Sequence, residues 1–207
     1  MQLRGTAAAL AVAALLAGAG AAVADPPNFD FNGYAQIPAA VGGNLTVRSV
    51  LTNNGVVPTP IPLNFTLNQY TLVVTGTLAS ISGINQDYNP TSVALYEDPI
   101  GGGTAANYAS PATFTDGTLI LSGTFTPALR RITFTPSLGS YIGTVNFSGG
   151  SLLGALGGLV NWPFGGGWSR SISGIPAGYQ ENWDGKIDLG AVGVETRTWD
   201  GVKRLYR

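Results

Sequence analysis

Hydrophobic and polar residues alternate along most of the chain. In QYTLVVTGTLASIS, residues 69–82, Tyr70, Leu72, Val74 and Leu78 occupy even positions, and mostly threonine or valine stands between them. A period of two with many β-branched residues predicts a half-buried strand. Five similar runs occupy residues 44–52, 91–98, 118–125, 131–138 and 141–148.

Turn-forming residues separate these runs, among them Asn53-Asn54-Gly55, Gly101-Gly102-Gly103 and Asp116-Gly117. Many short strands without a long helical period predict an all-β fold, and we expect an antiparallel β-sandwich of the jelly-roll or immunoglobulin-like kind. The alternation also assigns faces. In residues 118–125 we expect Leu121 to face the core and Thr124 to face solvent, and in residues 131–138 the apolar positions are Ile132 and Phe134.

The N-terminal segment differs from this body. Arg4 is the only charge in residues 1–24, an Ala/Leu/Val stretch follows, and the segment closes on Ala22-Val23-Ala24. This order predicts a secretory signal peptide, residues 1–24, cleaved after Ala24. An uncleaved anchor is the alternative, because residues 7–24 are uncharged and just long enough to span a bilayer. We expect the β-sandwich domain to occupy residues 25–190.

Composition narrows the chemistry. The chain has no His and no Cys, and only 10% of its residues are charged. Ser–His and Cys–His nucleophile pairs and His-ligated metals are therefore excluded, and the near-neutral charge gives no basis for nucleic-acid binding. An exported chain without disulfides suggests a bacterial source.

A glycine-rich apolar segment interrupts the alternation at residues 149–168. Leu152, Leu153, Leu156, Leu159 and Val160 recur at helical spacing. We expect a short apolar helix or loop near residues 151–160, too short to span a membrane.

Aromatic residues gather beside that segment. On loops such rings can act as platforms for sugar rings, and the alternative is that they pack against the sheets. The candidate carbohydrate-binding residues are Trp162, Phe164, Trp168, Tyr179 and Trp183.

Acidic residues are the remaining candidates for catalysis. A pair of carboxylates could hydrolyse a glycosidic bond, and the candidates are Asp87, Glu97, Asp98, Asp116, Glu181, Asp184 and Asp188. Oxygen ligands at Asn182, Asp184 and Asp188, or at Glu97 and Asp98, could instead hold Ca²⁺, although solvated turn carboxylates are the simpler explanation. We expect no other cofactor.

The C-terminal segment, residues 191–207, reads as a linker and an amphipathic tail. Wound as a short helix, it separates an apolar side from a basic side, with Thr198 as its cap. Such a tail docks either on its own domain or on a secretion or surface component. Its candidate recognition residues are Trp199, Lys203, Arg204, Tyr206 and Arg207.

Three segments in the order SVALYEDP, NYASPATFTDGTLILSGTF and VNFSGGSLLGALGG resemble uncharacterised exported bacterial β-sandwich proteins. The resemblance extends to the ectodomains of the PEP-CTERM proteins, which the exosortase system sorts. The chain lacks the Pro-Glu-Pro motif, hydrophobic helix and basic cluster of that anchor. The resemblance implies an envelope or extracellular role and no reaction.

Three functions follow as expectations. The first is a non-catalytic exported protein of the envelope or extracellular matrix that acts through surface contacts. The second is a carbohydrate-binding module, and the third is a carboxylate-dependent glycoside hydrolase. We expect an extracellular, cell-surface or periplasmic location, with a polysaccharide or an envelope or secretion component as partner.

Overall fold

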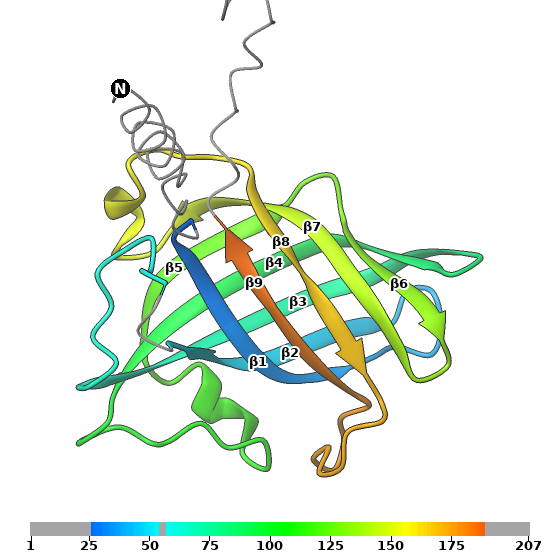
Figure 1. The fold of residues 1–207 in the computed structure, drawn as a ribbon, viewed down its shortest axis with the longest axis horizontal. Helices are drawn as coiled ribbons and strands as arrows, with labels where there is room; N and C mark the ends of the chain where they lie inside the picture. The colour runs from blue at the N-terminus through cyan, green and yellow to red at the C-terminus, as the bar shows by residue number, and fades with distance from the viewer. Residues whose placement is uncertain (1–25, 54–56, 189–207) are drawn as a thin grey trace, which may run out of the picture.

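A computed structural model describes residues 26–53 and 57–188 (Figure 1). The predicted signal peptide and C-terminal tail lie outside the described residues, as do the five candidate tail residues. The described chain forms nine strands. They are β1 (Asn28–Gln36), β2 (Asn44–Thr52), β3 (Asn68–Ser82), β4 (Asn85–Pro99), β5 (Thr118–Phe125), β6 (Leu129–Thr135), β7 (Leu138–Gly149), β8 (Trp162–Ser169) and β9 (Glu181–Asp188).

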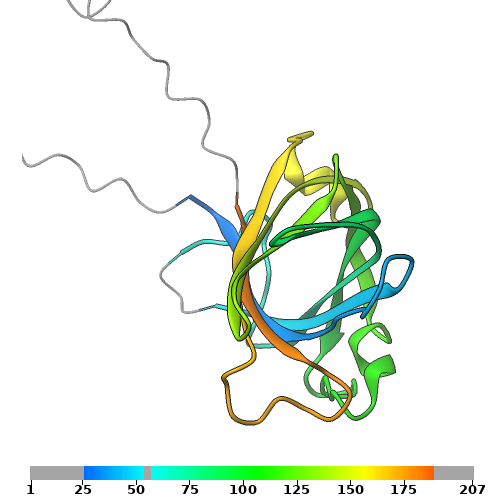
Figure 2. The same cartoon turned by 90° about the vertical axis from the view of Figure 1, so that its right-hand side faces the viewer.

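The strands close into an antiparallel barrel. The order around the sheet is β3-β2-β1-β9-β8-β7-β5-β4, and β4 pairs again with β3. Figure 2 shows the resulting ring. The expected β-sandwich is therefore wrong, and the fold is a closed eight-strand barrel. Alternation along a strand cannot separate the two folds, because both have one buried and one solvated face.

Nine strands fill eight positions because β5 and β6 share one. β5 pairs with β4 from Glu97↔Thr118 to Ser92↔Thr124, and with β7 from Ser122↔Gly149 to Phe125↔Val145. After Thr126-Pro127-Ala128 the chain continues as β6, which pairs with the other ends of the same two strands. The pair β1–β9 joins segments about 150 residues apart, since Asn32 faces Asp184.

Aromatic and aliphatic side chains fill the barrel. Tyr141 stacks on Trp183 with ring centroids 4.1 Å apart, and Phe31 stacks on Phe164 at 5.2 Å. An eight-stranded barrel is just wide enough for side chains to fill. The interior is thus a packed core, which leaves the ends and the outer face as the surfaces open to a ligand.

Four connections surround one end of the barrel, which we call the mouth: residues 37–43, 83–84, 136–137 and 170–180. Residues 150–161 lie at the opposite end, and residues 100–117 begin there and reach back to Tyr179 in the mouth; each connection has one short 3₁₀-helix (Figure 1). The helix expected near residues 151–160 is only the 3₁₀ turn Leu153–Leu156. It ends at Gly157, whose φ is 65°, so the predicted apolar face does not continue and Val160 is exposed.

The predicted core-facing and solvent-facing residues are correct in part of β5 and wrong in β6. Leu121 is buried and Thr124 exposed, as expected. A register shift lets Leu95 face Leu121 and Tyr96 face Leu119, so Leu119 is turned outward. In β6, Phe134 is 61% exposed and Arg131 is buried instead.

The described part of the chain has no helix with the length and apolarity that crossing a bilayer requires.

Candidate functional site

The predicted aromatic platform is not exposed. Trp162, Phe164 and Trp168 lie on β8 and Trp183 on β9, and each ring is at most 2% exposed inside the barrel. Tyr179 alone lies on a connection, where it is buried against two other tyrosine rings. The expectation that these rings lie on loops is therefore wrong for four of the five. Alternation along β8 and β9 turns those four into the core.

The candidate carboxylates are dispersed over the molecule, and several form ion pairs or accept hydrogen bonds from other side chains. Asp87 pairs with Arg130 on the outer face, and hydrogen bonding from that guanidinium lowers the pKa of Asp87. Glu97 accepts a hydrogen bond of 2.8 Å from the hydroxyl of Tyr70. Within residues 26–53 and 57–188, no three acidic side chains come together as a metal site.

The oxygen ligands proposed for Ca²⁺ on β9 also have other contacts. The amide of Asn182 donates to the carbonyl oxygen of Gly33 at 2.9 Å, and the carboxylate of Asp188 lies 3.6 Å from the ammonium of Lys186. These contacts give no support to calcium binding.

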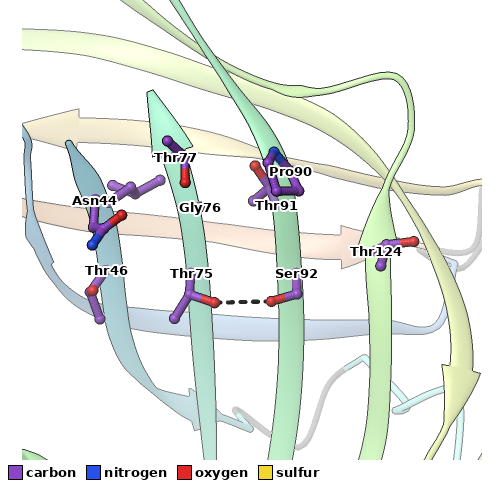
Figure 3. A pocket seen from close by; sticks show the side chains of 10 residues that line it. Asn44, Thr46, Thr75, Gly76, Thr77, Pro90, Thr91, Ser92 and Thr124 are labelled. Atoms are coloured by element: carbon purple, nitrogen blue, oxygen red, sulfur yellow. Dashed lines mark hydrogen bonds between the residues drawn. The ribbon is translucent and has the colours of Figure 1, made fainter. Parts of the chain in front are cut away.

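One candidate site is a shallow pocket of about 410 Å³ on the outer face (Figure 3). Thr46, Thr75, Ser92 and Thr124 form a row across β2, β3, β4 and β5, each directly opposite the next. The hydroxyls of Thr75 and Ser92 are hydrogen-bonded at 2.9 Å. We call these four residues the hydroxyl row. Outward polar residues are what strand alternation requires, so the row alone does not indicate a function.

A second candidate lies at the mouth, above a buried ion pair. The guanidinium of Arg131, on β6, donates through Nε and Nη2 to the two carboxylate oxygens of Glu181, on β9. The Nε–Oε2 distance is 2.9 Å, and both side chains are almost completely buried. The indole of Trp183 donates to the same Oε2 at 3.1 Å. These donors fix the orientation of the Glu181 carboxylate.

Side chains besides Glu181 also contact the guanidinium of Arg131. Its guanidinium carbon lies 3.7 Å from the ring centroid of Trp168, and its Nη1 donates to Gln86 Oε1 at 3.1 Å and to Thr133 Oγ1 at 2.9 Å. Gln86 Oε1 also accepts from the hydroxyl of Tyr88 at 3.0 Å. Burial raises the pKa of Tyr88 to about 12, so this phenol remains a donor at neutral pH.

A second arginine extends the network to the surface. Arg170 follows β8, its Nε donates to Glu181 Oε1 at 3.0 Å, and its Nη2 lies 2.9 Å from the same oxygen as an ion pair. Its side chain is 45% exposed. Arg170 is the only charged residue in the four connections of the mouth. It lines a pocket of about 460 Å³ together with Ile37, Pro38, Ala39, Gln86 and Gln180, which we call the mouth pocket.

Sequence reasoning considered Glu181 only as one of seven acids and did not single out Arg131. A signal was present in β9, where Glu181, Trp183 and Ile187 alternate on one face of ENWDGKID. A charge that shares its face with two large apolar residues faces the core, where it requires a partner. The partner could not be read from β6, because Ile132 and Phe134 suggested the opposite inward face.

Comparison with models of protein families, with curated proteins and with solved structures finds no match to this chain.

Proposed function

We propose that this chain is a non-catalytic exported protein that binds a ligand of the cell envelope or its surroundings in the mouth pocket. The observation that carries the proposal is the placement of a half-exposed Arg170 on a buried, fully bonded base of Arg131 and Glu181. A binding group held by such a base loses little conformational freedom when a ligand arrives. The predicted signal peptide supports an exported location.

The surroundings of Glu181 and Asp87 favour a binding function over hydrolysis. A general acid needs access to the bond it protonates, whereas the carboxylate of Glu181 is buried and its oxygens accept hydrogen bonds from Arg131, Arg170 and Trp183. The pKa of Asp87 is lowered by Arg130. A glycosidase acid requires a raised pKa, so Asp87 does not suit that role.

The mouth pocket is favoured over the hydroxyl row by its charge and by its construction. Its polar groups come from separate elements, Gln86 on β4 and Arg170 and Gln180 on the β8–β9 connection, and converge on one hollow. Convergent polar groups beside apolar surface are typical of ligand sites. The pocket of the hydroxyl row is lined by no charged side chain.

A pair of blocking substitutions tests the location of binding. Ala39 is exposed in the mouth pocket, and Ser92 is exposed in the hydroxyl row. Ala39→Trp should fill the first hollow and Ser92→Trp the second, whatever the charge of the ligand. On a glycan array with the mature chain, we expect binding that Ala39→Trp abolishes and Ser92→Trp retains, with no cleavage of the bound glycan.

The proposal fails if Ser92→Trp abolishes binding and Ala39→Trp does not, or if the bound glycan is cleaved. Melting curves of both variants serve as the control, because each substitution adds a large ring at an exposed position and should leave the fold intact.

A further inference from the structure

We propose that the mouth pocket recognises the carboxylate of a sugar acid, such as a uronic-acid residue of an acidic polysaccharide. The inference rests on the proposed function, since it names the ligand class of the same pocket. It follows from the direction of the hydrogen bonds, from the balance of charge and from the apolar wall of the pocket.

The polar side chains of the pocket present donors. Gln86 turns its oxygen toward Arg131 and Tyr88, and arginine has no acceptor, so the amide NH₂ of Gln86 is the group left for the pocket. Gln180 uses its oxygen to accept from the backbone N–H of Ile37 at 2.8 Å, and its NH₂ donates to the carbonyl oxygen of Gly178 at 3.3 Å, which leaves one N–H of this amide for a ligand. Arg170 can only donate. A ligand that satisfies these three side chains must accept hydrogen bonds.

The charge balance of the buried network favours an anionic ligand. Two guanidinium groups, those of Arg131 and Arg170, share the single carboxylate of Glu181. The network therefore carries one surplus positive charge. Nε of Arg170 donates to one oxygen of Glu181 and Nη2 lies beside the same oxygen, which leaves both N–H groups of Nη1 and one of Nη2 to bind other acceptors.

A single surplus charge matches a carboxylate better than a phosphate dianion. A carboxylate neutralises the network, and its two planar oxygens suit adjacent N–H groups of arginine and glutamine. A dianion would leave one negative charge uncompensated beside buried Glu181, where poor solvation makes such repulsion costly.

The rest of the pocket favours a sugar over a peptide C-terminus. Ile37, Pro38 and Ala39 offer an apolar wall on which the C–H face of a pyranose ring can pack. The backbone N–H groups of a peptide would need acceptors, whereas these glutamine and arginine side chains supply donors. Sugar hydroxyls can accept as well as donate, so they fit this lining.

Calorimetric titration of the mature chain with trigalacturonate and with its methyl ester tests the inference. The ester keeps the size and hydroxyls of the sugar and removes its charge. We expect the acid to bind about tenfold or more tightly than the ester, and Arg170→Gln to weaken binding of the acid by a similar factor, since charge-assisted hydrogen bonds are about twice as strong as neutral ones.

Arg130→Gln is the matched control. Arg130 has a similar exposed fraction, 49%, and a carboxylate partner, but lies on the outer face with Asp87. This variant should bind trigalacturonate as the wild type does. Equal losses in Arg130→Gln and Arg170→Gln would mean general attraction to charge and would overturn the inference.

The remaining outcomes separate the inference from the proposed function. If acid and ester bind equally and Ala39→Trp abolishes both, the mouth binds a neutral ligand, so the inference fails and the proposed function stands. Tighter binding of an acidic peptide C-terminus or of inorganic phosphate than of trigalacturonate also overturns the inference. Absence of binding to trigalacturonate overturns it as well, while glycan binding that Ala39→Trp abolishes would still support the proposed function.

Discussion

At the scale of single residues, one buried charge organises the mouth. Glu181 is completely buried and holds two arginines, and Arg131 beside it is 2% exposed. Burying charges is costly unless each one is paired and hydrogen-bonded. Removing one partner should therefore cost much more stability than removing both.

This expectation can be measured by chemical denaturation. Glu181→Leu leaves Arg131 buried without its partner and should lower the free energy of unfolding by about 3–5 kcal/mol. The double variant Arg131→Met/Glu181→Leu should lose less than that single variant. Asp87→Ala, which breaks the exposed pair with Arg130, should cost no more than about 1 kcal/mol. A double variant less stable than Glu181→Leu would contradict this account.

At the scale of elements, β8 shows how a glycine-rich strand serves a packed barrel. Residues 165–167 are three successive glycines between β7 and β9. A Cβ on Gly166 would collide with the carbonyl oxygen of Asp184 and the hydroxyl of Tyr141. A Cβ on Gly167 would have its nearest neighbour at an ordinary 3.7 Å. The two neighbouring glycines therefore differ in role.

The prediction for β8 compares two alanine substitutions in the same strand. Gly166→Ala should lower the free energy of unfolding by about 1–3 kcal/mol, because backbone and a buried ring must move. Gly167→Ala should leave stability unchanged or raise it by about 0.5–1 kcal/mol, because alanine restricts the unfolded chain more than glycine does. Thermal melting of both variants decides this, and equal losses would show that the close approach at Gly166 is unimportant.

Strands β2 to β7 were readable from the sequence, because alternation is a local property, whereas β1, β8 and β9 were not among the predicted strands. Leu121 and Thr124 fall on the predicted faces. The inward face of β6 was not readable, since only the pairing of Arg131 with Glu181, 50 residues later, makes an inward arginine stable. The mouth pocket was hidden for the same reason, as its residues come together only when the barrel closes.

At the scale of the whole molecule, closure distinguishes this fold from the sandwich that the alternation suggested. The contacts that close it join distant segments, β1 with β9 and β3 with β4. Buried tyrosines are distributed around the same barrel. Burial is the main cause of a raised pKa at Tyr70, Tyr88, Tyr108 and Tyr141.

Alkaline pH should therefore unfold the barrel. Below pH 10, these phenols are protonated in both states and stability should not depend on them. Tyr88 has a pKa of about 12 when folded against 10.0 ordinarily. As pH rises from 10 toward 12, the unfolded state binds fewer protons than the folded state, so the free energy of unfolding falls.

Denaturant unfolding followed across this range, together with the absorbance of phenolate, measures the effect. We expect stability to fall above pH 10 and the buried phenols to ionise together as the protein unfolds. Tyr88→Phe should make the decline shallower. Stability that stays constant up to pH 12 would be inconsistent with buried phenols of raised pKa.

Binding at the mouth is the central claim, and indole NMR tests it most directly. Trp168 and Trp183 donate their indole N–H at the mouth, to the carbonyl oxygen of Ile132 and to Glu181, whereas Trp162 donates to the carbonyl oxygen of Leu159 at the opposite end. On titration with trigalacturonate, the indole N–H resonances of Trp168 and Trp183 should shift together in a saturable way, and that of Trp162 should stay in place. A saturable shift of Trp162 with Trp168 and Trp183 unchanged would contradict the account.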